Sequence, residues 1–441
     1  MNSPLLSEAR HEEAFLRRLE RRDLTVGIIG LGWVGLPLAC AFAGAGFRVV
    51  GLDVDGAKVE RLRGGGASAA EEEARGWVER GRLDPTTAQE ALRACEAMVI
   101  CVPTPLSKFR DPDISHILAA RQALLPQLRA GDLVVLESTS WPGTTEELLA
   151  RCFTESGYRV GEDLFVAFSP ERVDPGNPHY GIRNTPKVVG GVTAACTRVA
   201  GALYATVVDR VVPVRSARTA EMVKLLENSF RAVNIALVNE MALICDRLGI
   251  GTYEVVEAAA TKPFGFMPFW PGPGIGGGCI PVNPVYLTWR MKTLGFAPRL
   301  IETAGEINAA MPAHVVDRLG RLLGEDGRAL SRAVILLVGV TYKRDVPDTR
   351  ESPARDIARL LLDRGVTLRV HDPLARELDL GEQVFVSEPL TVELLRGIDG
   401  AVLVADHRTL DYGLLLQHAP RILDARGVLR GKAGRAKVVS L

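Results

Sequence analysis

Residues 24–53 constrain the fold more than any other stretch of this chain. Residues 24–29 form an apolar run typical of a buried strand, and Gly30-Leu31-Gly32-Trp33-Val34-Gly35 follows it directly. Apolar residues at helical spacing come next, and a second apolar run, 48–52, ends in Asp53. A strand, a G-x-G-x-x-G turn, a helix and a strand that ends in an acid are the parts of a dinucleotide-binding βαβ unit. The alternative is a tight turn that binds nothing.

The glycines of this turn have separate tasks. Gly30 makes the turn, Gly32 lets the backbone approach a pyrophosphate, and Gly35 allows the helix to pack against the strand. The helix N-terminus that follows favours phosphate. We therefore expect the cofactor to contact the whole turn, Trp33 and Val34 included.

Asp53 and Lys58 predict which dinucleotide binds. The Asp53 carboxylate would accept hydrogen bonds from the adenosine ribose hydroxyls, which selects NAD over NADP. Lys58 lies five residues further on and would contribute on the ribose or phosphate side. The predicted cofactor is NAD.

Further apolar runs at 97–102, 133–137 and 164–168 predict strands. Open α/β sheets bind ligands at the carboxyl ends of their strands. We expect the residues that follow the first two runs to face the cofactor, unless the two threonines are ordinary strand-end caps; these are Pro103, Thr104 and Thr139. The third run leads into a polar loop stiffened by prolines, which would present a ligand with Glu171, Arg172 and Val173.

Residues 221–248 contain no glycine or proline and carry apolar residues close to helical spacing, so they predict one long helix. Such a helix would separate two domains and offer a face for a homodimer. Lys224 and Asn228 lie four residues apart and therefore share one face of it. The alternative is that they belong to an ordinary polar surface stripe.

The stretch 271–284 is rich in glycine and proline and predicts a loop that brings backbone close to a ligand. Cys279 lies between three glycines and a proline, so its sulfur has room to be approached. This suits a nucleophile. The alternative is a glycine-rich surface turn with an incidental cysteine.

A second α/β unit begins with the apolar run 333–340, and a charged loop with Ser352-Pro353 as a helix start follows. Strands are predicted at 367–370, 401–405 and 422–424, and we expect the last two to complete the sheet. The predicted fold is α/β, with two Rossmann-like doubly wound domains joined by a long central helix. The expected parts are a helical extension (1–23), a NAD-binding domain (24–214), a central helical domain with the cysteine loop (215–318) and a C-terminal α/β domain (319–441).

Composition excludes several classes of function. The 53 basic and 53 acidic residues cancel, so nothing suggests a nucleic-acid partner or a membrane surface. Seven cysteines without a C-x-x-C argue against disulfides and a structural metal site and favour a reducing cytoplasm. The chain contains no apolar run near the ~20 residues that a membrane span needs.

The ordered motifs of the chain resemble those of the UDP-glucose/GDP-mannose dehydrogenase family over nearly its full length. The matching segments are Gly30 to Gly35, Val102 to Pro105, Ser169 to Glu171, Lys224 to Asn228, Pro271 to Pro281 and Tyr342 to Pro353. Within the family, Ser-Pro-Glu-Arg-Val-Asp-Pro-Gly from Ser169 resembles the branch that acts on UDP-N-acetylhexosamines. The alternative is the UDP-glucose branch.

The resemblance implies a reaction and a role for each motif residue. The family oxidises the C6 alcohol of a UDP-sugar to a carboxylate and reduces two NAD. Cys279 would form a thiohemiacetal and then a thioester, which water cleaves. The other implied roles are oxyanion stabilisation by Lys224 and Asn228, water activation by Thr139 and Glu171, sugar binding by Arg172, Val173, Gly274, Gly277 and Lys343, and cofactor contact by Arg350.

Two positions depart from the family pattern. Family members generally carry Asp four residues after the cysteine, where this chain has Asn283, and an amide cannot take a proton near neutral pH. The His that the hexosamine branch usually places before the cysteine is Gly278 here. Three outcomes stay open: full four-electron oxidation, a reaction that stops at the aldehyde or thioester, and binding of NAD and UDP-sugar without turnover. A two-domain hydroxyacid dehydrogenase is the more distant alternative.

Overall fold

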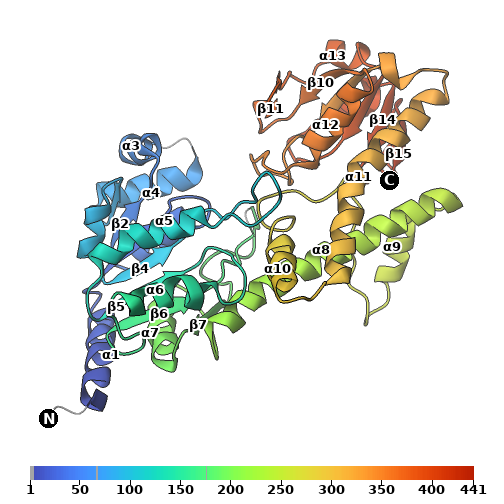
Figure 1. The fold of residues 1–441 in the computed structure, drawn as a ribbon. Helices are drawn as coiled ribbons and strands as arrows, with labels where there is room; N and C mark the ends of the chain where they lie inside the picture. The colour runs from blue at the N-terminus through green and yellow to red at the C-terminus, as the bar shows by residue number, and fades with distance from the viewer. Residues whose placement is uncertain (1–3, 66–67, 175) are drawn as a thin grey trace. The chain divides into compact units, whose positions relative to one another are not determined.

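The computed structural model describes residues 4–65, 68–174 and 176–441, which fold into two compact units (Figure 1). The N-terminal unit extends to Glu227 and includes Val285–Arg290. The C-terminal unit comprises Asn228–Pro284 and Met291–Leu441. Two helices contribute residues to both units, namely α8 (Ala217–Leu248) and α10 (Asn283–Thr293).

The N-terminal unit is built on one eight-stranded sheet. Its strands are β1 (Thr25–Ile29), β2 (Arg48–Leu52), β3 (Leu83–Thr86), β4 (Ala97–Ile100), β5 (Asp132–Leu136), β6 (Leu164–Phe168), β7 (Lys187–Gly191) and β8 (Val211–Val214). Their order is β3-β2-β1-β4-β5-β6-β7-β8, and neighbours are parallel except β6 and β7. The predicted doubly wound arrangement is confirmed for this half.

In the N-terminal unit, the strands that the sequence pattern did not predict are β3, β7 and β8. A proline lies inside β3 (Pro85) and inside β8 (Pro213), and β7 ends in two glycines. Proline and glycine are both weak strand formers. β3 and β8 form the two edges of the sheet, where proline is tolerated.

Helices cover both faces of this sheet. They are α1 (Pro4–Glu20), α2 (Gly35–Gly44), α3 (Gly56–Gly64), α4 (Ala69–Glu79), α5 (Ser115–Leu124), α6 (Arg151–Glu155) and α7 (Ala194–Tyr204), with the short turns η1 (Gln89–Ala94), η2 (Leu125–Gln127) and η3 (Thr145–Ala150). Successive strand residues point to opposite faces, so Val99 packs with α2 and α7 while Met98 packs with α5. Each face therefore has its own apolar core.

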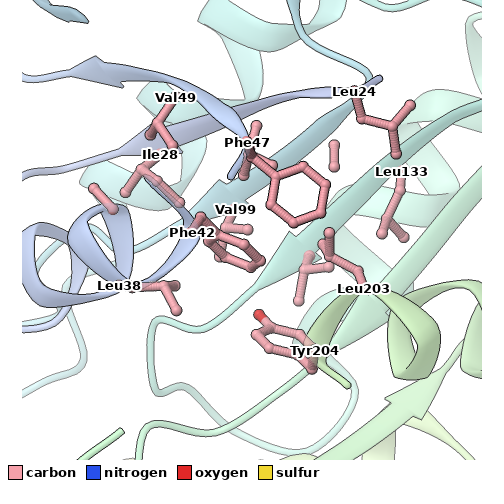
Figure 2. Close-up of a cluster of buried hydrophobic side chains, with 14 of the residues drawn as sticks. Leu24, Ile28, Leu38, Phe42, Phe47, Val49, Val99, Leu133, Leu203 and Tyr204 are labelled. Atoms are coloured by element: carbon pink, nitrogen blue, oxygen red, sulfur yellow. The ribbon is translucent and has the colours of Figure 1, made fainter. Parts of the chain in front are cut away.

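Figure 2 shows the core on the α2 and α7 side. Phe42 and Phe47 meet edge to face, with ring centroids 6.0 Å apart. The helix α1 belongs to the same core, because its Phe15 and Leu19 are buried in it. Glu12 of α1 also pairs with Arg198 of α7, with a shortest N···O distance of 2.6 Å. The predicted N-terminal extension is thus a helix that packs on the N-terminal unit.

The C-terminal unit contains a five-stranded parallel sheet in the order β10-β9-β13-β14-β15. The strands are β9 (Val334–Val338), β10 (Thr367–His371), β13 (Gly400–Leu403), β14 (Arg421–Asp424) and β15 (Lys437–Ser440), and β11 (Glu377–Asp379) and β12 (Val384–Val386) form a separate antiparallel pair. The expectation that 422–424 completes the sheet is wrong, since β15 pairs with β14. β15 has only four residues, of which two are valine, so its apolar run is too short to predict a strand.

The helices of the C-terminal unit, besides α8 and α10, are α9 (Thr252–Ala260), α11 (Arg299–Gly324), α12 (Pro353–Asp363), α13 (Val392–Arg396) and α14 (Tyr412–His418), with the turn η4 (Leu330–Arg332). α11 and α12 pack on one face of the sheet and α13 and α14 on the other. Ser352 caps α12 as predicted, because its side chain accepts a hydrogen bond from the Ala354 N–H.

The predicted long helix is confirmed as α8, although it begins at Ala217 rather than at residue 221. Its 32 residues correspond to about 48 Å at 1.5 Å per residue. Among the described residues, no helix is long and apolar enough to cross a membrane.

Candidate active site

The glycine turn after β1 has two packed glycines and one open glycine. Gly30 adopts φ +95°, and a Cβ there would lie 2.7 Å from the Cys101 carbonyl oxygen. A Cβ on Gly35 would overlap the carbonyl oxygen of Gly30. Around Gly32, by contrast, no heavy atom lies within 4 Å of the Cβ position. The turn therefore leaves backbone accessible at Gly32, as a pyrophosphate site requires.

Asp53 is held at the end of β2 and is only 8% exposed. Its carboxylate accepts hydrogen bonds from the Leu31 N–H at 2.8 Å and the Asp55 N–H at 3.0 Å, and it pairs with Lys58 Nζ at 2.8 Å. Burial opposes ionisation, but these hydrogen bonds and the Lys58 charge outweigh it and lower the pKa of Asp53. The residue is thus an acceptor at the position expected for the ribose.

The remaining predicted cofactor residues of the N-terminal unit lie at strand ends or in the glycine turn. Trp33 is 53% exposed, and Val34 is half-buried at the start of α2. Pro103 is exposed, while Thr104 and Thr139 are half-buried. The Ser138 hydroxyl, next to Thr139, donates to the Val102 carbonyl oxygen at 2.8 Å. This hydrogen bond connects the segments that follow β4 and β5.

The structure brings Lys224 of α8 and Glu171 together. Lys224 is buried, and its Nζ donates to the Glu171 carbonyl oxygen at 2.5 Å. The Glu171 carboxylate accepts the Val173 N–H. Arg172 pairs with Glu227 of the same helix at 2.7 Å. The loop 171–173 is thus fastened to α8 at two points.

Lys187 is a buried charged residue next to Glu171 that the sequence did not mark as part of the site. Lys187 Nζ is 2.9 Å from a Glu137 carboxylate oxygen and 3.8 Å from a Glu171 carboxylate oxygen, and the Tyr204 hydroxyl donates to Glu137. Burial disfavours the charged form of Lys187, but the two carboxylates outweigh it and raise the pKa of the ammonium. One sequence signal was available, because Glu137 directly follows an apolar strand.

Glu221 is a second buried carboxylate that the sequence analysis missed. It lies three residues before Lys224 in α8 and accepts hydrogen bonds from the Gly143 N–H at 2.5 Å and the Thr145 N–H at 2.8 Å. Burial raises the pKa of Glu221 to about 7. The residue fixes the turn that opens η3, a few residues after Thr139.

In the C-terminal unit, Cys279 is the one exposed residue among the seven cysteines, all of which lie in the described ranges. The glycines before it differ in their surroundings. A Cβ on Gly277, at φ +87°, would lie 2.7 Å from the Tyr342 ring, and one on Gly274 would meet the Asn308 carbonyl oxygen at 3.3 Å. Gly278 has no heavy atom within 4 Å of its Cβ position. The loop is therefore packed up to Gly277 and open at the cysteine.

Two buried amides accompany the cysteine in this unit. The Asn283 N–H donates to the Cys279 carbonyl oxygen at 2.8 Å, and the Asn283 side chain is 3% exposed. Asn228 of α8 is 6% exposed. Within the described part of the chain, neither Nδ2 has a hydrogen-bond partner. A buried donor without a partner costs about 1–3 kcal/mol, so an oxygen that reached either amide would be stabilised by it.

The loop 341–353 packs on the cysteine loop. Besides the Tyr342 ring at Gly277, the Glu351 carbonyl oxygen lies 2.7 Å from the Cβ position of Gly276. Arg350 pairs with Asp348 at 2.7 Å, and this hydrogen bond, together with smaller effects that include the nearby Cys279, raises the pKa of Arg350. Lys343 is half-buried in the same loop. Among the described residues, no group of three or more His, Cys, Asp or Glu side chains is placed to hold a metal ion.

Comparisons with known proteins cover nearly the whole chain. Three models of the UDP-glucose/GDP-mannose dehydrogenase family match in order: the NAD binding domain at 24–208, the central domain at 218–310 and the UDP binding domain at 336–431. The domain limits predicted above remain predictions.

Named relatives and a solved structure agree with these matches. The chain is 35% identical to a UDP-N-acetyl-D-glucosamine 6-dehydrogenase of Pseudomonas aeruginosa, over 88% of this chain and 91% of that one. It is 38% identical to a UDP-N-acetyl-D-mannosamine dehydrogenase of Yersinia pestis, over 87% and 94%. The structure of a UDP-D-ManNAc dehydrogenase from Pyrococcus horikoshii superposes with a TM-score of 0.85 at 31% identity, over 94% of this chain and 99% of that one.

The order of the three domain matches sets aside the hydroxyacid dehydrogenase alternative, because a UDP binding domain follows the central domain. NAD is the cofactor that the first domain binds, and its open glycine turn and ionised Asp53 fit that ligand. The chain belongs to the UDP-glucose/GDP-mannose dehydrogenase family and is an NAD-dependent nucleotide-sugar dehydrogenase.

Proposed function

We propose that this enzyme oxidises the C6 hydroxyl of a UDP-N-acetylhexosamine to the carboxylate through a covalent intermediate on Cys279. The observation that carries the proposal is the exposure of Cys279 beside the open Gly278, in a loop packed against 341–353. The substrate class rests on the relatives, which are named for UDP-N-acetyl-D-glucosamine and UDP-N-acetyl-D-mannosamine. The motif that starts at Ser169 supports the same class.

The glycine turn and Asp53 would bind NAD twice in succession, and each NAD would supply the acceptor for one of the two hydrides that the sugar C6 loses. In the first oxidation the hydroxyl proton passes to the water that Thr139 and Glu171 hold, as the hydride departs. Lys224 and Asn228 stabilise the negative charge on that oxygen, Lys224 through its ammonium and Asn228 through its unpartnered amide. Arg350 contributes to cofactor binding, and Lys343 contacts the nucleotide sugar.

The second oxidation needs Cys279, since an aldehyde carbon has no hydride to give until a nucleophile adds. The sulfur adds to C6, the C=O π bond opens, and the oxygen takes up the thiol proton to give a thiohemiacetal. Loss of the C6 hydride to the second NAD and of the hydroxyl proton to water then gives a thioester. Water then attacks the thioester, the C–S bond breaks, and the thiol and the carboxylate are released. Thr139 and Glu171 hold and activate this water.

We propose that Asn283 serves as a hydrogen-bond donor in these steps. Its Nδ2 is buried and lacks a partner within the described residues, and the residue lies one helical turn after Cys279. A donor at this position would hold a substrate or water oxygen but could not accept its proton. Asn283 also favours the second candidate function. If the reaction requires a base at this position, the amide cannot act as one, and the enzyme would stop at the aldehyde or stall as the thioester.

The homodimer and a cytoplasmic location are also part of this proposal. Large apolar side chains are exposed along α8 at spacings of four or seven residues, which places them in one stripe. They are Met222, Leu226, Phe230, Leu237, Ile244 and Leu248. Light scattering should give a dimer at micromolar concentration and a monomer for the Leu237→Glu/Ile244→Glu variant. A monomeric wild type would contradict the assembly.

The decisive experiment counts NADH formed per UDP-N-acetylglucosamine consumed and takes the mass of the product. Two NADH per sugar and a uronic acid support the full reaction. One NADH, with an aldehyde or an enzyme-bound thioester, supports the second candidate. NAD binding without NADH from either UDP-N-acetylglucosamine or UDP-glucose would mean that the chain binds its ligands without turnover.

A further inference from the structure

A buried histidine joins three loops at the carboxyl ends of β9, β10 and β13. His407 is 0% exposed, and its Nε2 lies 3.2 Å from an Asp372 carboxylate oxygen and 3.0 Å from the Thr341 hydroxyl. Its Nδ1 accepts the Asp345 N–H at 2.9 Å. The reaction proposed above uses none of these contacts.

The hydrogen bonds determine which ring nitrogen carries the proton of the neutral ring. A backbone N–H can only donate, so Nδ1 is the acceptor and Nε2–H is the donor. The Asp372 carboxylate also accepts the Val340 N–H at 2.6 Å and the Thr341 N–H at 3.2 Å. Asp372 therefore holds the Nε2 side of the ring, and the Nδ1 side accepts a hydrogen bond from the loop 341–345.

The loop 341–345 is held at residues on both sides of Lys343. The Thr341 hydroxyl donates to the Lys343 carbonyl oxygen at 2.9 Å. Arg344 donates to the Asp406 carbonyl oxygen at 2.9 Å, and Asp345 accepts the Arg408 N–H at 2.9 Å. Asp345 has φ 58°, a left-handed conformation that needs surrounding contacts to persist. The His407 acceptor is one of these contacts.

We propose that His407 is a positioning residue for the UDP-sugar. It holds the Asp345 N–H and the Thr341 hydroxyl and thereby sets where Lys343 and Tyr342 lie. Tyr342 in turn packs on Gly277 of the cysteine loop. The inference rests on the proposed function, in which Lys343 contacts the nucleotide sugar. His407 itself touches no substrate, because it is fully buried.

The test compares three substitutions of His407 with a matched control. His407→Ala removes the contacts with Asp372, Thr341 and Asp345. His407→Gln offers a donor toward Asp372, and His407→Asn places an acceptor near the position of Nδ1. The control is His371→Ala at the end of β10, since His371 is also buried but bonds the Glu388 carbonyl oxygen at 2.7 Å. UDP binding by calorimetry and the KM values for UDP-N-acetylglucosamine and NAD are measured on each protein, with thermal unfolding as the check of folding.

We expect His407→Ala to raise the Kd for UDP and the KM for the UDP-sugar about tenfold, while the KM for NAD stays within about twofold. His407→Asn should recover most of the affinity, and His371→Ala should leave it unchanged. Should His407→Ala fail to fold, His407→Gln is expected to show the same split. Unchanged UDP affinity in a folded His407→Ala or His407→Gln, or a parallel rise of both KM values, overturns the inference.

UDP titration needs no turnover, so it separates this inference from the proposed function. A wild type that binds UDP but forms no NADH refutes the proposed reaction, and weaker UDP binding by the His407 variants would still support the positioning role. A wild type that does not bind UDP overturns both.

Discussion

The glycine turn of the N-terminal unit and the cysteine loop of the C-terminal unit solve the same steric problem. In each, glycines are packed so closely that a Cβ would collide, at Gly30 and Gly35 in the turn and at Gly276 and Gly277 in the loop. In each, one further glycine is open, Gly32 in the turn and Gly278 in the loop. The packed glycines shape the backbone, and the open glycine marks where a ligand can approach.

The two regions differ in what they present at the open position. The turn presents backbone N–H groups and the start of α2, which suit a pyrophosphate but have no reactivity of their own. The cysteine loop presents an exposed thiol, which we propose as a nucleophile. Substitutions at the packed and open positions should therefore separate folding, cofactor binding and covalent chemistry.

The largest effect is expected for Cys279→Ala. Without the sulfur, no thioester can form, and the rate of uronic acid production should fall by about 10⁴-fold or more. Product mass spectrometry and NADH formation are the measurements. Cys152→Ala, at a half-buried cysteine of α6, is the control and should keep wild-type activity. Carboxylate formation by Cys279→Ala at a rate near that of the wild type would refute the covalent mechanism.

The next effect compares Gly35→Ala with Gly32→Ala. A Cβ at Gly35 overlaps backbone, so this variant should lose about 3 kcal/mol or more of unfolding free energy. Gly32→Ala has room for its methyl group and should fold normally, but it should weaken NAD binding about tenfold because the methyl group lies where the pyrophosphate approaches. Denaturant unfolding and NAD titration check the pair. Equal stability of the two variants would contradict the packed-and-open distinction.

The same distinction applies to Gly277→Ala and Gly278→Ala. Gly277 has φ +87° and faces the Tyr342 ring, so alanine there should cost about 1–2 kcal/mol of unfolding free energy. Gly278→Ala should leave unfolding unchanged and lower kcat/KM for the UDP-sugar about tenfold by crowding Cys279. If Gly278→Ala had full activity, the open glycine of this loop would not mark a ligand approach.

The last substitution, Asn283→Asp, tests whether the cysteine loop needs a donor or a base. If the amide donates to an oxygen, a carboxylate in its place should lower kcat about tenfold, because a buried donor is replaced by an acceptor. Asn283→Ala should lose a similar factor. A rate gain in Asn283→Asp would instead show that the site lacks a base, and it would favour the enzyme that stops at the aldehyde or thioester.

Local patterns in the sequence predicted the parts of the fold that depend on neighbouring residues. The strand, the turn from Gly30 to Gly35, the helix and the acid Asp53 lie within about thirty residues of sequence and could be recognised together. Ser352 likewise caps α12 directly before Pro353, as expected. Strands with clear apolar runs were found, whereas β3 and β8 were missed because Pro85 and Pro213 weaken the signal and only pairing at a sheet edge makes them strands.

Contacts between distant residues lay beyond prediction. Glu137 and Lys187 form a buried ion pair although they lie fifty residues apart in the sequence. In the sequence, each is only a charged residue near an apolar run, so their pairing could not be predicted. Asp372 and His407 meet only because β10 and β13 flank β9. The sequence already marked Asn283 as a departure from the family pattern, but only the structure shows that its Nδ2 is buried and has no partner among the described residues.

The exposure of a single thiol has a consequence beyond catalysis. Six of the seven cysteines are buried or half-buried, so an electrophile added to the folded protein should modify Cys279 first. The amount of alkylating reagent that reacts quickly would then equal the number of Cys279 thiols in a preparation of folded protein. The same exposure is a vulnerability, because peroxide would oxidise this sulfur before the others and, under the proposed mechanism, stop the second oxidation step.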